Sequence, residues 1–397
     1  MKSRIDDGCF HGGAFFQAVG EGFDDLSRRD RIVNADVLDA WFPPAPGVLA
    51  SLNEHMSWLA RTSPPTTCAG LRAAIARARW LHEPNILPAA GSSALIYLAM
   101  REWLTPRSRV LLLDPCYGEY SHVLEKVIGC AVDRLALREE DAWLPDLEAL
   151  ARHLAKYYDL FVLVNPNNPT GRIVSRDAIV RLVDKLGERT RVWVDEAYID
   201  YVDPNQSMEQ FAARSANVFV CKSLSKVHAL SGMRAAYLVG PDAELARLRR
   251  LTPPWAVSLP AQVAAVRALE NPAYYRRRYR ETDALRGSLR KALSNLPFVR
   301  DVSGSANFLL VHLDTGAPDV AAILDACRHE GVFLRDVSNM GQALGTRVFR
   351  TAVKDGNDNL RITSALARAL GGPQRLRVPV VPDQGELATP SVRIRIG

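Results

Sequence analysis

The chain has 397 residues, of which 48% are hydrophobic and 24% charged, as in ordinary globular proteins. No apolar stretch approaches the roughly 20 residues that a membrane-spanning helix needs, and the acidic N-terminus lacks the apolar segment of an export signal. The formal net charge of +6 is compatible with small anionic ligands and too weak to indicate nucleic-acid binding.

The six cysteines are scattered, with no C-x-x-C pair among them. This pattern is typical of reduced thiols in a cytoplasm and argues against a zinc site or a disulfide scaffold. The histidines also lack the spacing of metal ligands, so we predict no metal site.

From about residue 70 to residue 250, apolar runs alternate with helical patterns. We expect strands within 85–93, 108–115, 130–137, 160–171, 191–201, 216–225 and 233–240. We expect helices within 94–104, 118–129, 144–158 and 175–188. Strands that are apolar on both faces and separated by helices indicate an α/β fold with a mostly parallel sheet, covered by helices on each side.

The second half of the chain begins with a long predicted helix over 271–296, which has Tyr275, Tyr279 and several leucines near one face. Short strands within 306–313, 331–337 and 346–353 and a helix over 358–372 follow it. The last 25 residues show no helical period, and we assign them no role. We therefore expect three parts, which are an N-terminal arm (1–45), a large domain (46–275), and the long helix with a smaller C-terminal α/β domain (276–397).

Small polar motifs follow the predicted strands. They are GSS at 91–93, DPCYGEY at 114–120, NPNNPTG at 165–171, DEAY at 195–198 and SLSKVHALSGMR at 223–234. In sheets of this kind, ligands bind beyond the carboxyl ends of the strands, which is where these motifs lie.

In this order, the motifs resemble those of the fold-type I, pyridoxal-phosphate-dependent aminotransferases of class I/II. Within that family the chain is most similar to the histidinol-phosphate aminotransferase branch, over about residues 35–371. The resemblance implies the cofactor pyridoxal 5′-phosphate (PLP) and transfer of an amino group to a 2-oxo acid. The amino donor would be an amino acid or a similar amine, phosphorylated or not. The resemblance also implies a homodimer, with neither nucleic acid nor membrane as a partner.

Lys226 is the residue that the resemblance assigns to a Schiff base with the cofactor aldehyde. A lysine flanked by small residues at a strand end can be partly desolvated and placed beside other cations, which activates its amine. The alternative is an ordinary surface lysine. In the family the freed lysine also moves a proton from the substrate Cα to the cofactor.

The cofactor phosphate requires hydrogen-bond donors and positive charge. Ser223, three residues before the lysine, and Arg234, eight after it, lie at the family's spacing for phosphate ligands. Gly91, Ser92 and Ser93 would add backbone N–H groups and hydroxyls at a helix N-terminus, where the helix dipole favours an anion. Considered alone, GSS could equally be a simple helix cap.

The cofactor ring is contacted by four further residues in the family. Asp195 would keep the pyridine nitrogen protonated, so that the ring can accept electrons from the substrate Cα. Asn168 and Tyr198 would bind the ring 3-oxygen, and Tyr117 would stack on the ring face. The alternatives are a strand-end aspartate, a turn at the NNP segment and a core tyrosine.

A substrate carboxylate calls for a bidentate arginine, and two residues compete for this role. Arg361 matches a family string but falls inside the last predicted helix. Arg350 lies on a strand followed by a turn and that helix, which is the family's order, so we choose Arg350. Asn307 also matches a family string, and Arg335 matches the position that contacts the substrate phosphate in the histidinol-phosphate branch.

Two family strings are absent. The Tyr-Pro string that reaches a partner's cofactor phosphate is replaced by 61–70 (RTSPPTTCAG), and the Asn-Glu-Asn-Pro string by 38–46 (LDAWFPPAP). Trp41 and Phe42 would either line the pocket or belong to a packed arm. The YYRRRYR segment (274–280) interleaves aromatic residues with arginines, and we interpret it as the solvated face of a helix.

Two other functions remain open at this stage. The same cofactor and fold would serve a decarboxylase, a lyase or an oxidase, because each of these reactions begins with the same covalent bond between the cofactor and the substrate amine. A non-catalytic sensor domain of a transcription regulator would need a helix-turn-helix domain of roughly 70 residues before it, and the arm is too short for one.

Overall fold

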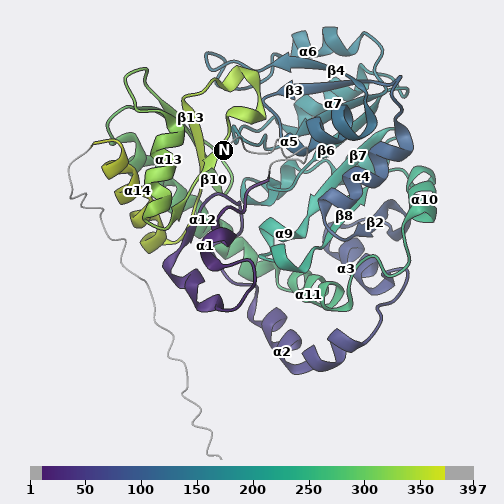
Figure 1. Cartoon of the computed structure of the whole chain (residues 1–397). Helices are drawn as coiled ribbons and strands as arrows, with labels where there is room; N and C mark the ends of the chain where they lie inside the picture. The colour runs from purple at the N-terminus through teal and green to yellow at the C-terminus, as the bar shows by residue number, and fades with distance from the viewer. Residues whose placement is uncertain (1–10, 372–397) are drawn as a thin grey trace, which may run out of the picture.

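The computed structural model describes residues 11–371, and its largest layer is a seven-stranded sheet (Figure 1). The strands are, in spatial order, β2 (Ile86–Ala89), β8 (Ala236–Val239), β7 (Val218–Ser223), β6 (Arg191–Asp195), β5 (Leu160–Val164), β3 (Arg109–Asp114) and β4 (Ala131–Ala136). β3 to β7 pair in parallel, and β8 pairs antiparallel with both of its neighbours. The predicted α/β fold with a mostly parallel sheet is confirmed.

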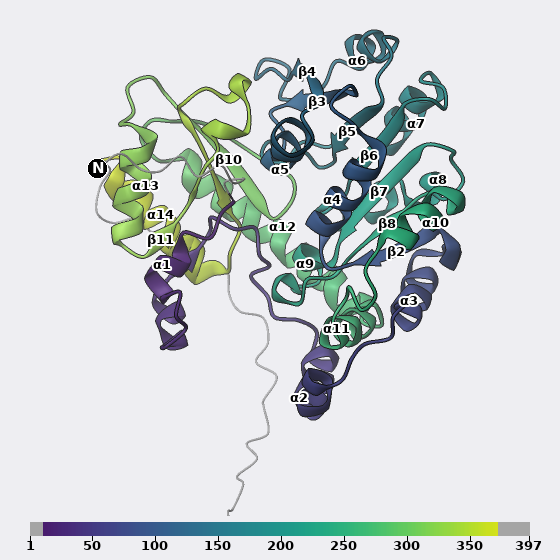
Figure 2. The same cartoon turned by 45° about the vertical axis from the view of Figure 1, so that its right-hand side comes forward.

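Both faces of this sheet are buried, because successive side chains of each strand enter two different cores. In β5, Leu160 and Val162 enter a core with α4 (Ser92–Trp103), whereas Phe161 and Leu163 enter the other core with α7 (Arg176–Asp184). Figure 2 shows α4 and α7 on opposite sides of the sheet. The continuous apolar runs in the sequence are a consequence of this double burial.

Further helices cover this sheet or connect its strands. They are α2 (Pro46–Arg61), α3 (Ala69–Arg79), α5 (Gly118–Ser121), η3 (His122–Ile128), α6 (Leu147–Leu154), α8 (Glu209–Ala212), α9 (Leu224–Val227), α10 (Asp242–Leu251) and α11 (Leu259–Leu269). Several begin where the sequence supplies a capping side chain. Asp146, Ser175 and Ser258 each accept a hydrogen bond from a backbone N–H in the first turn of α6, α7 and α11.

A smaller, antiparallel sheet lies beside the first. Its order is β12 (Arg335–Asp336), β13 (Val348–Ala352), β10 (Phe308–Leu313) and β9 (Val299–Ser303). The predicted long helix is α12 (Pro272–Ser294), with a proline in its first turn, and it leads into this sheet. α13 (Val320–His329) and α14 (Gly356–Ala369) pack against each other beside it. Neither α13 nor β9 was predicted.

The N-terminal arm lies on the same side of the molecule as the smaller sheet, a position that the sequence did not reveal. It contains α1 (Phe15–Val19), η1 (Leu26–Arg31) and β1 (Val33–Asn34), and β1 pairs in parallel with β11 (Val332–Phe333). Figure 1 shows this purple segment beside the green and yellow C-terminal elements. The segment after β1 therefore crosses from the smaller sheet toward the large one.

The proposed division at residues 45 and 275 remains a prediction, and the final 25 residues lie outside the described part. Within residues 11–371, none of the helices combines the length and apolar character needed to cross a membrane.

Candidate active site

The carboxyl ends of β5, β6 and β7 bring the predicted motifs together. Val164 pairs with Asp195, and Asp195 pairs with Cys221, so the loops after these strands leave one edge of the sheet side by side. The NPNNPTG, DEAY and SLSK segments follow those three strands. The convergence is a direct consequence of parallel pairing.

Lys226 lies in α9, the single helical turn that follows β7. Its side chain is 19% exposed, and its Nζ lies 2.9 Å from Oδ1 of Asp39 and 3.5 Å from the Ser231 hydroxyl. Ser223 caps this turn by accepting a hydrogen bond from the Ser225 N–H. The amine is therefore mostly shielded from solvent and is held by polar side chains beyond the end of β7.

Arg234 lies against Gly91 at the start of α4. A Cβ at Gly91 would collide with the guanidinium of Arg234, and Gly91 has a φ of +96°, so both the space and the backbone favour glycine here. Arg234 Nη1 lies 3.5 Å from the Ser225 hydroxyl and 3.3 Å from the Ser231 carbonyl oxygen. The Arg234 cation therefore lies beside both the N-terminus of α4 and the serines of the lysine segment.

The GSS segment starts α4 as predicted, with Gly91 at its N-cap. The Ser93 hydroxyl donates to Oε2 of Glu119 at 3.0 Å, and Glu119 is buried. In this structure Ser93 therefore faces a carboxylate, while Ser92 makes no such contact among the described residues. That all three residues serve the phosphate stays a prediction.

Asp195 is a buried carboxylate with two hydrogen bonds. The Tyr120 hydroxyl donates to Oδ2 at 2.7 Å, and the Ala197 N–H donates to Oδ1 at 3.1 Å. The Trp193 indole in turn donates to the Tyr120 oxygen at 2.7 Å. Burial raises the pKa of Asp195 to about 6, although these two hydrogen bonds oppose the shift. A cation placed beside this carboxylate would stabilise its ionised form.

Arg350 of β13 connects the smaller sheet to the motif loops. Its Nη1 donates to Oδ1 of Asn168 at 2.6 Å, and its Nη2 donates to the backbone oxygen of Asp36 at 2.9 Å. Burial lowers the pKa of Arg350 to about 10, and the nearby Tyr198 hydroxyl opposes this shift. Its Nε is buried and has no hydrogen-bond partner within residues 11–371. Tyr198 is buried too, and burial raises its pKa.

Arg335 is also buried, and its Nη1 lies 3.7 Å from Oδ1 of Asp36. It helps to line a cavity of about 250 Å³ between the smaller sheet and the segment after β3. His11 and Tyr117 also line it, with 3.4 Å between His11 Nδ1 and the Tyr117 hydroxyl. His122 and Lys126 also line this cavity, so four of its lining side chains can carry positive charge.

The structure bears on four other interpretations of the sequence. The Asn307 amide donates to the Leu38 backbone oxygen at 3.0 Å, so it orders the arm segment. Arg361 lies in α14, partly exposed and paired with Asp358, as predicted for the rejected candidate. Trp41 donates to Thr282 of α12 at 2.8 Å, which confirms a packed arm. In the YYRRRYR segment, Arg276, Arg277 and Arg280 are exposed.

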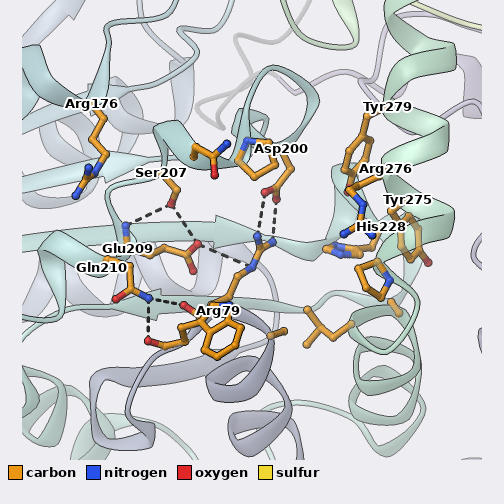
Figure 3. A pocket seen from close by; sticks show the side chains of 17 residues that line it. Arg79, Arg176, Asp200, Ser207, Glu209, Gln210, His228, Tyr275, Arg276 and Tyr279 are labelled. Carbon is orange, nitrogen blue, oxygen red and sulfur yellow. Dashed lines mark hydrogen bonds and ion pairs between the residues drawn. The ribbon is translucent and has the colours of Figure 1, made fainter.

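A second buried group of charges lies near the same strand ends, and we name it the Lys222 cluster. Its members are Arg79, Glu196, Asp200, Glu209 and Lys222. Figure 3 shows Arg79 directed at Asp200 and Glu209 along the wall of a cavity of about 700 Å³. That cavity contains none of the predicted site residues, and its lining residue His228 is held neutral because burial lowers its pKa to about 3.

The sequence model of the family described as aminotransferase class I and II matches residues 42–366. The chain belongs to this family.

Two curated relatives illustrate the range of activities among similar sequences. The histidinol-phosphate aminotransferase of Xanthomonas euvesicatoria is 33% identical, and the match covers 78% of this chain and 84% of the relative. The threonine-phosphate decarboxylase of Salmonella typhimurium is 31% identical, with 76% and 81% covered. Membership of the family therefore leaves two reactions to be distinguished.

Solved structures agree with the fold. The histidinol-phosphate aminotransferase of Clostridium acetobutylicum has a TM-score of 0.77 at 22% identity, covering 85% of this chain and 98% of that chain. The enzyme of Sinorhizobium meliloti, solved in complex with pyridoxal 5′-phosphate, also has a TM-score of 0.77 at 21% identity, with 84% and 89% covered.

The cofactor of this aminotransferase family member is pyridoxal 5′-phosphate. The residues present fit the group. The bare Gly91 backbone beneath the Arg234 guanidinium is suited to a phosphate, and the buried Asp195 carboxylate is suited to a protonated ring nitrogen. Both features are properties of these side chains and this backbone.

Several neighbours of the site were missed in the sequence. Tyr120 was within a quoted motif but received no role, and Asp36, Asp39 and His11 belong to the arm, for which no element was predicted. Lys222 carried a usable signal, because a lysine inside an otherwise apolar strand implies a buried ion pair.

Proposed function

We propose that this protein is a PLP-dependent aminotransferase that moves an amino group from an amino acid, or a similar amine, to a 2-oxo acid. The donor is phosphorylated or otherwise carries a second anionic group. The observation that carries the proposal is the mostly shielded Lys226 amine, which follows β7 directly beside the end of β6, where Asp195 and Tyr198 lie. The homologous relatives make transamination the first reaction to test.

In this proposal, five side chains act on the cofactor. PLP supplies an electron-accepting ring that makes the Cα hydrogen of a bound amine acidic. Lys226 would hold the cofactor covalently at rest and, once the amine of the substrate has replaced it, would carry the proton from Cα. Asp195 would keep a proton on the ring nitrogen, Asn168 and Tyr198 would donate to the ring oxygen, and Tyr117 would cover the ring face.

The phosphate of the cofactor would bind between the lysine segment and α4. Arg234 would supply the positive charge, Ser223 a hydroxyl, and Gly91, Ser92 and Ser93 their donors at the helix N-terminus. Support comes from the close approach of Arg234 to Gly91 and from the contact of Arg234 with the Ser225 hydroxyl. For Ser93, binding would require it to leave Glu119.

Substrate recognition is assigned to the smaller sheet. Arg350 would bind the substrate carboxylate, using a guanidinium that already carries a buried, unpaired Nε–H among the described residues. Asn307 would order the segment that closes over it. Arg335, at the wall of the 250 Å³ cavity, would face a second anionic group of the substrate, together with Lys126 and His11.

A second candidate function is decarboxylation of an amino-acid phosphate. The observation that favours it is the 31% identity to a threonine-phosphate decarboxylase, which is comparable to the identity with the aminotransferases. The cofactor site would be unchanged in this case. The difference would be the orientation of the substrate, since the bond that lies perpendicular to the ring plane is the one that breaks.

One experiment separates the two functions. The purified, PLP-loaded protein is incubated with amino acids and amino-acid phosphates, with and without 2-oxoglutarate, and the keto product and CO2 are both measured. Transamination predicts a keto product that depends on the 2-oxo acid. Release of CO2 without a 2-oxo acid would contradict the proposal and establish the second candidate.

We further propose that the protein works as a homodimer in the cytoplasm. The family resemblance supports the dimer, and the five described cysteines, all free and buried, support a reducing compartment. Light scattering of the purified protein tests the assembly, and a monomeric mass with full activity would contradict it.

A further inference from the structure

Asp39 is the only carboxylate that contacts the Lys226 amine within residues 11–371. Its Oδ1 lies 2.9 Å from Nζ of Lys226, and the two side chains are 34% and 19% exposed. Asp39 belongs to the segment that replaces the family's Asn-Glu-Asn-Pro string. The carboxylate therefore lies at a position where this chain differs from the resemblance described above.

The position of Asp39 is fixed by the smaller sheet. The backbone of its segment is held by Arg350, which donates to the Asp36 oxygen, and by Asn307, which donates to the Leu38 oxygen. Lys354 completes the set, because its Nζ donates to the Asp39 backbone oxygen at 3.2 Å. These three side chains come from β13, from the segment before β10 and from the loop before α14.

The charges around the contact are few. Lys354 is buried, and burial lowers its pKa to about 8 despite the opposing effect of Asp39. Burial by itself would raise the pKa of Asp39, but the Lys226 ammonium and the Ser231 hydroxyl lower it, and the net shift is downward. Asp39 thus remains ionised at neutral pH.

Other titratable groups that face this contact come from two further elements. Tyr198 and Tyr201 lie on the segment after β6, and the charge of Asp39 raises the pKa of each, in addition to the larger effect of burial. Asp355 and Asp358 lie beyond Lys354 and raise its pKa. Near neutral pH both tyrosines are neutral, whereas Asp39 and Lys354 carry charge. Arg234 is a further cation in this neighbourhood, because its Nη1 lies 3.3 Å from the carbonyl oxygen of Ser231, whose hydroxyl contacts Lys226.

We propose that Asp39 is a further catalytic residue, whose carboxylate keeps a proton on the nitrogen of Lys226, with Lys354 opposing it. The inference rests on the proposed function, in which that nitrogen bonds to the cofactor. A protonated nitrogen withdraws electrons from the carbon to which it is bonded, and this makes the carbon easier for an incoming amine to attack. An amide at this position would provide no such charge.

The first test uses the full chain freed of cofactor, so that no turnover is involved. An amine-reactive acylating reagent labels neutral amines, and peptide mass spectrometry follows Lys226 against the exposed Lys185 as an internal reference. At pH 8, Asp39→Asn should label Lys226 about ten-fold faster than the wild type, since loss of a neighbouring opposite charge changes protonation by about one pH unit. Lys354→Met should label Lys226 more slowly than the wild type, because it removes a neighbouring positive charge.

The matched control is Asp30→Asn, an exposed aspartate whose side chain is 73% accessible and pairs only with its neighbour Arg29 among the described residues. It should label Lys226 at the wild-type rate. Asp39→Glu, which retains the charge, should stay closer to the wild type than Asp39→Asn. Equal labelling of Lys226 in Asp39→Asn and the wild type, with circular dichroism unchanged, would overturn the inference.

A second test separates this inference from the proposed function. The visible absorption of the PLP-loaded protein is titrated with pH in the wild type, Asp39→Asn and Lys226→Ala. One absorption band belongs to the form in which the nitrogen between Lys226 and the cofactor is protonated. We expect this band to disappear at a pH about one unit lower in Asp39→Asn than in the wild type. If Lys226→Ala keeps the band, the proposed function fails. If it loses the band while Asp39→Asn titrates like the wild type, only the inference fails.

Discussion

Two lysines, four residues apart, lie at the end of the same strand and are held in opposite ways. Lys222 is 2% exposed, and its Nζ lies 3.4 to 3.8 Å from the carboxylates of Glu196, Asp200 and Glu209. Lys226 is 19% exposed and has one carboxylate partner, Asp39. Lys222 is held by three buried carboxylates that help to fix the fold, whereas Lys226 has a single, partly exposed partner that it can leave.

The difference shows how one strand end can serve both stability and chemistry. Glu196 and Asp200 of the Lys222 cluster flank the loop that carries Tyr198, so the cluster fixes the position of that loop. Arg79 adds a bidentate pair with Asp200 at 3.1 and 3.0 Å. Because these charges are buried and mutually paired, removing one leaves others without a partner. A partly exposed pair such as Lys226 with Asp39 contributes little to stability.

The most direct test of the contrast between the two lysines is Lys226→Ala, for which the largest effect is expected. We expect turnover to fall by at least about 10⁴-fold, because the residue is both the nucleophile and the proton carrier in the proposed reaction. The free energy of unfolding should change by less than about 1 kcal/mol. Activity assays and denaturant unfolding of the cofactor-free protein measure the two effects. Retained turnover would refute the assignment of the lysine.

Lys222→Met should give the reverse result. It leaves three buried carboxyl groups facing one another and Arg79, so we expect a loss of about 3–5 kcal/mol in the free energy of unfolding at pH 7. Burial raises the pKa of Glu196 to about 7, so protonation should make the loss smaller at pH 5. Urea unfolding at both pH values, with the exposed Lys185→Met as control, decides the point. A loss below about 1 kcal/mol would remove the contrast between the lysines.

Asp195→Asn should stabilise the cofactor-free protein while impairing cofactor binding. Since burial raises the pKa of Asp195 to about 6, the folded state holds this proton more tightly than the unfolded chain. Ionisation of Asp195 therefore lowers the free energy of unfolding as pH rises from about 4 to about 6, by roughly 3 kcal/mol in total. The variant should be more stable than the wild type by up to that amount at pH 8, and no more stable at pH 4.

The measurement for Asp195→Asn is thermal or urea unfolding without cofactor at the two pH values. Asp177→Asn, an exposed aspartate in α7, serves as the matched control. A variant that is less stable than the wild type at both pH values would show that the hydrogen bonds from Tyr120 and Ala197 outweigh the cost of the buried charge. Such a result would also weaken the argument for a cationic partner.

Arg350→Lys tests the substrate side of the site. Lysine cannot bridge Asn168 and the Asp36 backbone oxygen as the guanidinium does, nor can it bind a carboxylate in bidentate fashion. We expect KM for a carboxylate-bearing substrate to rise about 10- to 100-fold, with a smaller change in kcat. The ester of the same substrate should be affected much less. An equal loss with acid and ester would contradict direct carboxylate binding.

Much of the large sheet and of the motif positions could be predicted from the sequence. Parallel strands buried on both faces produce continuous apolar runs, and the residues after them must meet at one edge. The arm could not be predicted in this way. β1 has only two residues, and Asp39 reaches Lys226 through contacts made by Arg350 and Asn307, more than 250 residues later.

The smaller sheet was predicted only in part for a similar physical reason. β10 and β13 are fully buried strands, which the sequence revealed, whereas β9 has only five residues, of which the first three are partly or fully exposed and the last two are buried. Short, half-exposed strands carry little periodic signal. Ser93 is a different case, since its predicted position at the start of α4 is confirmed but its partner, Glu119, depends on a contact with another helix.

The smallest expected effect concerns the attachment of the arm that carries Asp39. Thr282→Val removes the acceptor of the Trp41 indole N–H and should cost about 1 kcal/mol of unfolding free energy, the cost of a partly buried donor left unpaired. The spectral titration of the cofactor should stay that of the wild type, because Arg350 and Asn307 still hold the backbone beside Asp39. If the titration instead shifts as in Asp39→Asn, then α12, and not the smaller sheet, positions the carboxylate against Lys226.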